Sequence, residues 1–117
     1  MNGIVLAFIG DAVYSLYVRE KMAFSCDAKA GELNRMTAEK VKAAAQADLL
    51  EKLLPEFTEE ELAVYKRARN SKKGTKAKSS TVAQYNMSTG FEAVIGYLYI
   101  TGATERLNEL LGFEETR

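Results

Sequence analysis

The feature that most constrains the fold is an apolar segment, residues 3–20, with a single aspartate near its centre. Apolar residues fall on nearly every side of a 3.6-residue period, which predicts a long helix that is buried on most of its surface. A bare carboxylate in such a helix is strongly unfavourable, so Asp11 must be protonated, bound to a metal or paired with a lysine or arginine. The ion pair, at the edge of the core, is the ordinary alternative to a functional site.

The composition favours one all-α domain over residues 1–117. Alanine, leucine, glutamate and lysine outnumber valine and isoleucine, and the only proline is Pro55. Histidine is absent, which excludes histidine triads, histidine-zinc sites and histidine general bases. The single cysteine, Cys26, excludes an internal disulfide and fits a reducing compartment. Without a signal-peptide pattern or an apolar run of membrane-spanning length, we expect a soluble, cytoplasmic protein.

Basic residues are concentrated in one segment although the net charge is zero. Residues 66–78 hold seven of the sixteen lysines and arginines and no acidic residue. The rest of the chain, with nine basic and sixteen acidic residues, therefore carries a charge of −7. Residues 70–86 have few apolar side chains and are predicted to form a long loop. The basic segment is either a solvated stretch or a surface for an anionic partner.

Local signals predict six helices arranged around two central ones. Thr37 is interpreted as the N-cap of a helix that Pro55 stops, and Thr58 with Glu61 forms a capping box for the next helix. An apolar segment that begins at Ser88 is the second central helix. The predicted ranges are residues 3–20, 28–35, 38–54, 59–70, 88–101 and 103–111.

The two central helices share a composition that predicts a joint site. Each contains one glycine near its middle, Gly10 or Gly96, and one interior carboxylate, Asp11 or Glu92. A glycine inside a helix commonly marks a close crossing, and a crossing there would turn both carboxylates towards one pocket. Two carboxylates in a dry place repel each other, and Mg²⁺, which prefers oxygen ligands, relieves that repulsion. Glu92 has a structural alternative, because Thr89 and Glu92 have capping-box spacing at the predicted start of the second helix.

Short motifs on these helices resemble the ribonuclease III catalytic domain. Residues 8–13, FIGDAV, resemble the family signature FLGDAV, and residues 92–96, EAVIG, resemble its second motif EALIG. Residues 34–36, NRM, and the alanine-rich helix after them resemble the central helices of that family. The closest resemblance is to its short form, the Mini-ribonuclease III family, through YVRE at 17–20, KRARN at 66–70 and STGFEA at 88–93.

The resemblance implies an all-helical homodimer that cuts double-stranded RNA with Mg²⁺, or with Mn²⁺ as a substitute, and has no separate RNA-binding domain. It implies maturation of precursor large-subunit (23S) ribosomal RNA, with a ribosomal protein as a candidate accessory partner. Asp11 and Glu92 would be the catalytic and metal-binding residues. The expected RNA-binding residues are Lys66, Arg67, Arg69, Lys72, Lys73, Lys76 and Lys78. The expected dimer surface, from the excess of apolar residues, includes Phe8, Val13, Leu16, Tyr97 and Tyr99.

Two positions depart from the family pattern. The larger enzymes carry a glutamate where this chain has Ala7 and an aspartate where it has Thr89. The missing carboxylates leave a second hypothesis open, a non-catalytic RNA-binding or ribosome-associated module with the same fold. A helical protein-interaction domain without a nucleic-acid partner is a third hypothesis, which the basic segment disfavours.

Overall fold

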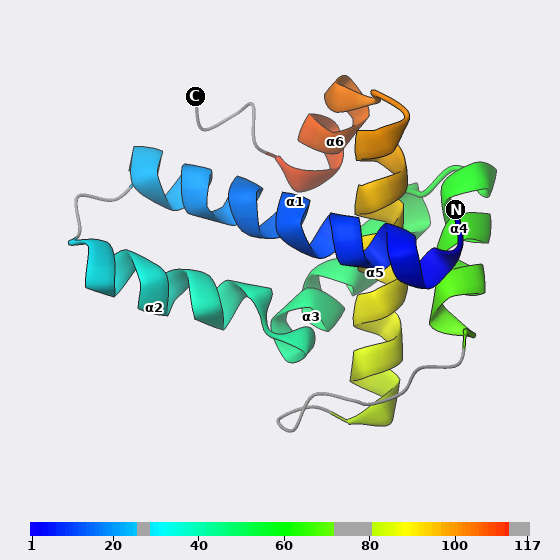
Figure 1. The fold of residues 1–117 in the computed structure, drawn as a ribbon, viewed down its shortest axis with the longest axis horizontal. Helices are drawn as coiled ribbons and strands as arrows, with labels where there is room; N and C mark the ends of the chain where they lie inside the picture. Colours follow the sequence, from blue (N-terminus) through cyan, green and yellow to red (C-terminus); the bar gives the residue numbers. More distant parts are fainter. Residues whose placement is uncertain (26–28, 72–80, 113–117) are drawn as a thin grey trace.

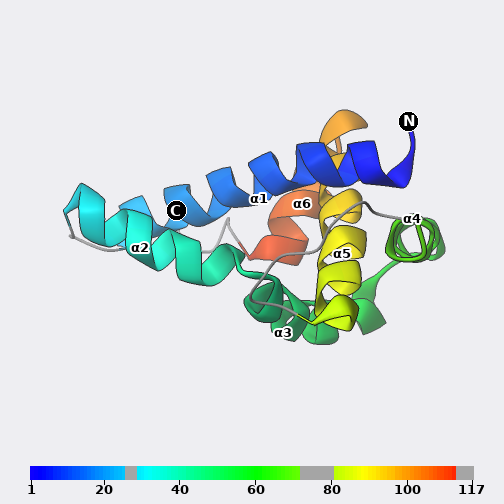
Figure 2. The same ribbon diagram turned by 60° about the horizontal axis from the view of Figure 1, so that its bottom comes forward.

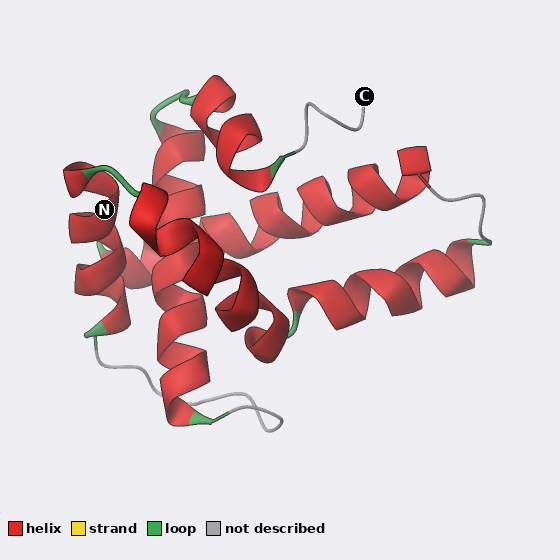
Figure 3. Cartoon of the chain, turned by 180° about the vertical axis from the view of Figure 1, so that it is seen from behind, coloured by secondary structure: helices red, strands yellow, loops and turns green. Residues whose placement is uncertain are grey.

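The computed structural model describes residues 1–25, 29–71 and 81–112, and every regular element in these ranges is helical (Figures 1 and 3). This confirms the all-α prediction. None of the described helices is both long and apolar enough to cross a membrane. The elements are α1 (Gly3–Ser25), α2 (Ala30–Val41), α3 (Ala43–Leu53), the 3-10 helix η1 (Leu54–Glu56), α4 (Glu59–Arg69), α5 (Val82–Ile100) and α6 (Thr104–Leu111).

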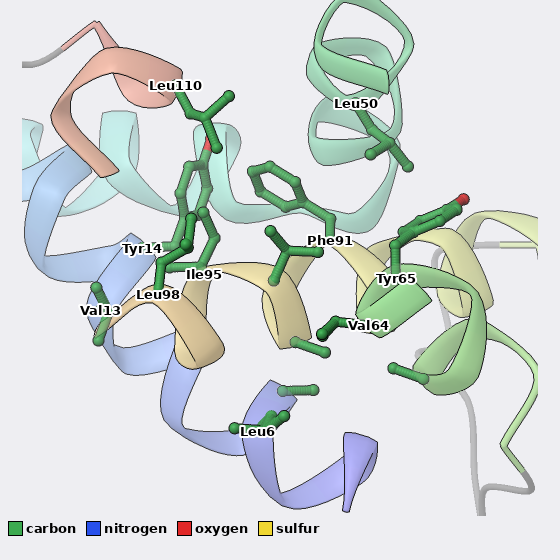
Figure 4. Close-up of a cluster of buried hydrophobic side chains, with 14 of the residues drawn as sticks. Leu6, Val13, Tyr14, Leu50, Val64, Tyr65, Phe91, Ile95, Leu98 and Leu110 are labelled. Carbon is green, nitrogen blue, oxygen red and sulfur yellow. The ribbon is translucent and has the colours of Figure 1, made fainter. Parts of the chain in front are cut away.

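Helix α5 is the centre of the fold, and α1 crosses it (Figure 1). Helices α3 and α4 pack against other sides of α5, α2 folds back beside α1, and α6 follows α5 (Figures 1 and 2). Apolar side chains from the surrounding helices converge on Phe91 and Ile95 of α5, which are completely buried (Figure 4). The predicted arrangement around two central helices is therefore confirmed for α1 and α5.

Side-chain hydrogen bonds fix the start of α4 and the position of α6. The predicted capping box is present, since the Glu61 N–H donates to Thr58 Oγ1 at 3.1 Å and the Thr58 N–H donates to Glu61 Oε1 at 3.0 Å. Arg106 of α6 donates to both carboxylate oxygens of Glu61, each at 2.8 Å. This partly buried ion pair ties α6 to α4.

The predicted boundary near Thr37 is wrong. Helix α2 continues through Thr37 to Val41. The helical conformation is interrupted at Lys42, which has an extended backbone (φ −61°, ψ 147°). Thr37 is only 3% exposed, so its position is explained by packing rather than by capping. The break turns the chain sharply and allows α3 to reach α5.

The prediction that α1 is buried on most of its surface is wrong for the single chain. One side of the helix, with Leu6 and Val13, is buried, but Phe8 is 80% exposed and Leu16 is 57% exposed. Among the residues predicted for the dimer surface, Tyr99 is also exposed, Tyr97 is partly buried and Val13 is buried. The exposed positions of α1 are spaced by about one helical turn, so they form one apolar stripe, made of Ile4, Val5, Phe8, Ala12 and Leu16.

Candidate functional site

Helices α1 and α5 cross at Gly10 and Gly96, where their backbones touch. A Cβ atom on Gly10 would lie 1.7 Å from the carbonyl oxygen of Glu92, and one on Gly96 would lie 2.0 Å from the carbonyl oxygen of Leu6. Only hydrogen fits at either position. This confirms that the two glycines mark a close crossing, and because Asp11 directly follows Gly10, the crossing brings Asp11 to Glu92.

Asp11 and Glu92 form a pair of interacting carboxyl groups. Burial, and then a hydrogen bond to Asp11 and the negative charge of Asp11, raise the pKa of Glu92 to about 8. Without a cation, the pair therefore keeps a proton at neutral pH. The charge of Asp11 raises the pKa of Glu92 in the direction expected for two carboxylates that repel each other.

The two carboxyl groups differ in burial. Glu92 is partly buried, whereas Asp11 is exposed in the single chain, which corrects the expectation of a buried aspartate. Successive helical residues are rotated by about 100°, so the residue after Gly10 lies beside the contact line with α5, where it reaches Glu92 and still faces solvent in the single chain. Among the described residues no lysine or arginine pairs with Asp11, and the ion-pair alternative is therefore wrong within that part of the chain.

The capping-box alternative for Glu92 is also wrong. Helix α5 begins at Val82, where Thr81 and Gln84 form the capping box through bonds of 3.0 and 3.4 Å. Thr89 lies inside the helix, and its hydroxyl donates to the Tyr85 carbonyl oxygen at 3.0 Å. Glu92 therefore has no capping role and is available to the pair.

Gln46 is a site residue that the sequence reasoning missed. It lies on α3, and its Nε2 donates to Glu92 Oε2 at 3.1 Å and to the Val41 carbonyl oxygen at 3.0 Å. Its Oε1 accepts a hydrogen bond from the Ser88 hydroxyl. The only local signal was an amide within an alanine-rich stretch, and its partners on α5 lie 42 and 46 residues further along the chain.

Tyr14 of α1 is close enough to Glu92 to interact with its charge. Its ring meets Phe91 edge-on, with centroids 5.3 Å apart and planes at 83°. Burial, and then the charge of Glu92, raise the pKa of the Tyr14 hydroxyl. A change in the charge of Glu92 is therefore expected to change the pKa of Tyr14.

A cavity of about 440 Å³ is lined in part by Tyr14. It lies between α1, α2, α3 and α6, and Lys21, Lys40 and Lys52 are among the residues that line it. Neither carboxyl group of the pair lines this cavity, so it is separate from the carboxylate site.

Of the predicted RNA-binding residues, those that the structure describes lie at the end of α4. Lys66 and Arg67 are exposed, and the Arg69 guanidinium lies 5.4 Å from the centre of the Tyr65 ring. Gly3 at the start of α1 abuts Ala68, where a Cβ on the glycine would come within 2.8 Å. The basic end of α4 is therefore held at the start of the helix that carries the aspartate of the pair, about 12 Å away along the axis. The other predicted RNA-binding residues, Lys72, Lys73, Lys76 and Lys78, lie outside the described residues.

The donor set fits a hard divalent cation held by few protein ligands. Ala7 and Thr89, at positions that carry acids in the larger enzymes, are both buried. Within residues 1–25, 29–71 and 81–112, no group of three or more metal-binding side chains occurs. Two mutually repelling carboxylates suit Mg²⁺, which takes one or two protein carboxylates and keeps several waters.

In the metal-free protein, we expect stability to fall as the pH rises from about 4.5 to about 8. Glu92 holds its proton up to about 8 when folded but releases it near its usual value of 4.5 when unfolded. Between these values the folded state binds more protons, so the free energy of unfolding decreases with pH. Melting temperatures measured across this range in a chelating buffer should show the decrease, and Glu92→Gln should remove it. If the melting temperatures of the wild type and Glu92→Gln changed with pH in the same way, the raised pKa could not belong to Glu92.

Known proteins are similar to this chain over the region that contains the carboxylate pair. Residues 4–103, which include Asp11 and Glu92, match the Ribonuclease III domain family. The chain is 47% identical over 115 residues to Mini-ribonuclease 3 of Streptococcus pneumoniae, and this alignment covers 97% of this chain and 90% of the relative. It is 43% identical over 115 residues to Mini-ribonuclease 3 of Enterococcus faecalis, covering 97% and 87%. A crystal structure of a Fusobacterium nucleatum protein matches with a TM-score of 0.87 at 31% identity, covering 96% of this chain and 89% of that one.

Proposed function

The chain belongs to the ribonuclease III domain family and is an endoribonuclease for double-stranded RNA, and we propose that Asp11 and Glu92 are its catalytic carboxylates. The observation that carries the proposal is the pairing of these two side chains at the Gly10–Gly96 crossing. The capping and ion-pair alternatives would have given them separate structural roles.

We propose Mg²⁺ as the cofactor, with Asp11 and Glu92 as its protein ligands and Mn²⁺ as a substitute. When bound, such a cation supplies charge stabilisation at the phosphate and a more acidic water. Glu92 must release its proton before it can act as a ligand. Asp11 is exposed and can meet a phosphodiester from solvent, whereas Glu92 is held from behind by Gln46.

A cleavage assay on a defined RNA duplex, with Mg²⁺ and with a chelator, tests this proposal. We expect cutting only with the cation. Retained duplex binding without cutting under both conditions would instead favour the non-catalytic RNA-binding module, for which the missing acids at Ala7 and Thr89 are the supporting observation.

We further propose precursor 23S ribosomal RNA as the substrate, a cytoplasmic location and a single domain over residues 1–117. The likeness to Mini-ribonuclease 3 proteins over nearly the whole chain supports these points. Cutting of a precursor 23S fragment should exceed cutting of an unrelated duplex of equal length. Repeating the assay with ribosomal proteins bound to the fragment tests the accessory partner.

We expect the basic segment to contact the RNA backbone without reading sequence. Changing Lys72, Lys73, Lys76 and Lys78 to alanine should weaken binding to all duplexes alike and flatten its salt dependence. Each lost phosphate contact removes roughly one unit from the slope of log K against log salt. A matched variant with Lys21, Lys29, Lys40 and Lys52 changed to alanine has the same charge change elsewhere and should keep the slope. Equal slopes for the first variant and the wild type would show that RNA binds another surface.

We propose that the apolar stripe of α1 forms the interface of a two-fold homodimer. An exposed apolar surface of this kind is unusual on a monomer, and two-fold pairing is the commonest closed arrangement. Leu16→Arg should reduce the mass in solution from two chains to one chain of 13.0 kDa and stop double-strand cutting. Val82→Arg is a control at an equally exposed residue outside the stripe, and it should keep the mass. A wild-type monomer that cuts both strands at micromolar concentration would contradict the dimer.

A further inference from the structure

Gln46 is a buried amide that joins α3 to the carboxylate pair. It is 1% exposed, yet both hydrogens of Nε2 are used, one on Glu92 Oε2 and one on the Val41 carbonyl oxygen. Its Oε1 accepts from the Ser88 hydroxyl, which lies one helical turn before Glu92 on α5. A single side chain from α3 is therefore hydrogen-bonded to two residues of α5 that lie one helical turn apart, and one of them is Glu92.

The bonding pattern allows only one orientation of the amide. If Nε2 and Oε1 exchanged places, the oxygen would face the Val41 carbonyl oxygen, which can only accept, and that hydrogen bond would be lost. The nitrogen therefore donates to Glu92, and this bond fixes the position of Oε2. A carboxylate with one oxygen fixed has lost most of its freedom to rotate.

Packing alone does not require an amide at this position. The neighbouring α3 residues Ala47 and Leu50 are buried and apolar, and a methionine would fill a similar volume without three hydrogen bonds to satisfy. Gln46 does serve one structural purpose, because the Val41 carbonyl at the end of α2 has no partner in its own helix. The bonds to Ser88 and Glu92 do not serve that purpose.

We propose that Gln46 is a positioning residue, which orients the Glu92 carboxylate for a divalent cation and thereby sets cation affinity and cleavage rate without contacting RNA. This inference rests on the proposed function of the pair. Residues that hold metal-binding carboxylates from behind commonly contribute about 10- to 100-fold to metal affinity or activity.

Gln46→Met keeps the length of the side chain and removes its hydrogen bonds. We expect the dissociation constant for Mn²⁺, measured by calorimetry on the dimer without RNA, to rise about 10- to 100-fold. At limiting Mg²⁺, kcat should fall by a similar factor while KM for duplex RNA stays the same. Gln46→Glu, which keeps the length but cannot donate to Glu92 when ionised, should not restore either value.

Leu53→Ala is the matched control, because it removes buried volume from α3 outside the hydrogen-bond network. It should lower the melting temperature at least as much as Gln46→Met and leave the Mn²⁺ affinity unchanged. Ser88→Ala loosens Gln46 without removing it, and we expect it to shift Mn²⁺ affinity in the same direction by a smaller factor. This variant carries the test if Gln46→Met does not fold.

Wild-type Mn²⁺ affinity and kcat in the folded Gln46 and Ser88 variants would overturn the inference. A loss of affinity that tracks the melting temperature equally in Leu53→Ala would overturn it as well. Asp11→Asn, measured in parallel, separates the two proposals. If Asp11→Asn still cuts, the proposed function fails, whereas an inactive Asp11→Asn beside a wild-type-like Gln46→Met removes the positioning role alone.

Discussion

Asp11→Asn is expected to lower the rate of duplex cleavage by about 10³-fold or more, with the fold and RNA binding retained. The substitution keeps the size of the side chain but removes the negative charge that the proposed cation requires. Stability should not fall and can rise, because the change also removes the repulsion that raises the pKa of Glu92. Single-turnover cleavage at saturating enzyme, with a melting curve and a binding curve in chelator, measures all three quantities.

Glu92→Gln should give a loss of similar size. The control is Asp48→Asn, the same chemical change at an exposed carboxylate of α3 outside the pair, which should cut at the wild-type rate. Wild-type turnover by Asp11→Asn or Glu92→Gln on the same duplex would remove that residue from the site.

Gly96→Ala is expected to produce a large loss of stability, because the added methyl group has no room at the crossing of α1 and α5. The new Cβ would lie 2.0 Å from the Leu6 carbonyl oxygen, so α1 and α5 would have to separate along the whole crossing. Overpacking of a core commonly costs about 1–3 kcal/mol, and we expect at least the upper end because the obstacle is backbone rather than a movable side chain. Denaturant unfolding measures this loss, and cleavage should decline with it because the carboxylate pair is formed by the crossing.

Gly31→Ala is the matched control, because a Cβ on Gly31 of α2 has no atom within 4 Å. Replacing an exposed helical glycine by alanine should be neutral or stabilise by up to about 1 kcal/mol. Equal unfolding midpoints for Gly96→Ala and wild type would mean that the helices do not cross at these glycines.

The sequence predicted the elements whose signal is local or compositional. Gly10 and Gly96 stood out as glycines near the middle of two apolar helices. Gly10 directly precedes Asp11, and Gly96 lies about one helical turn after Glu92, which is close enough to predict the crossing. The start of α5 was predicted too late, because residues 70–86 as a whole have few apolar side chains and the capping box formed by Thr81 with Gln84 was not recognised.

Other features depend on contacts that no local pattern contains. The partners of Gln46 on α5 are distant in the chain, and its neighbours on α3 gave no sign of a polar network. Apolar periodicity also does not distinguish a face covered by the same chain from one left exposed, which is why the exposed stripe of α1 was predicted to be mostly buried.

The electrostatic interaction between Tyr14 and Glu92 gives this protein an intrinsic optical reporter. The chain has no tryptophan and six tyrosines, so its near-ultraviolet signal comes from tyrosine, and Tyr14 is the one whose hydroxyl pKa is raised by the charge of Glu92. A cation on the pair would offset that charge and make the Tyr14 hydroxyl easier to ionise. An alkaline absorbance titration of tyrosinate, compared with and without Mg²⁺ and with Tyr14→Phe as the blank, would therefore follow occupation of the site without RNA and without turnover.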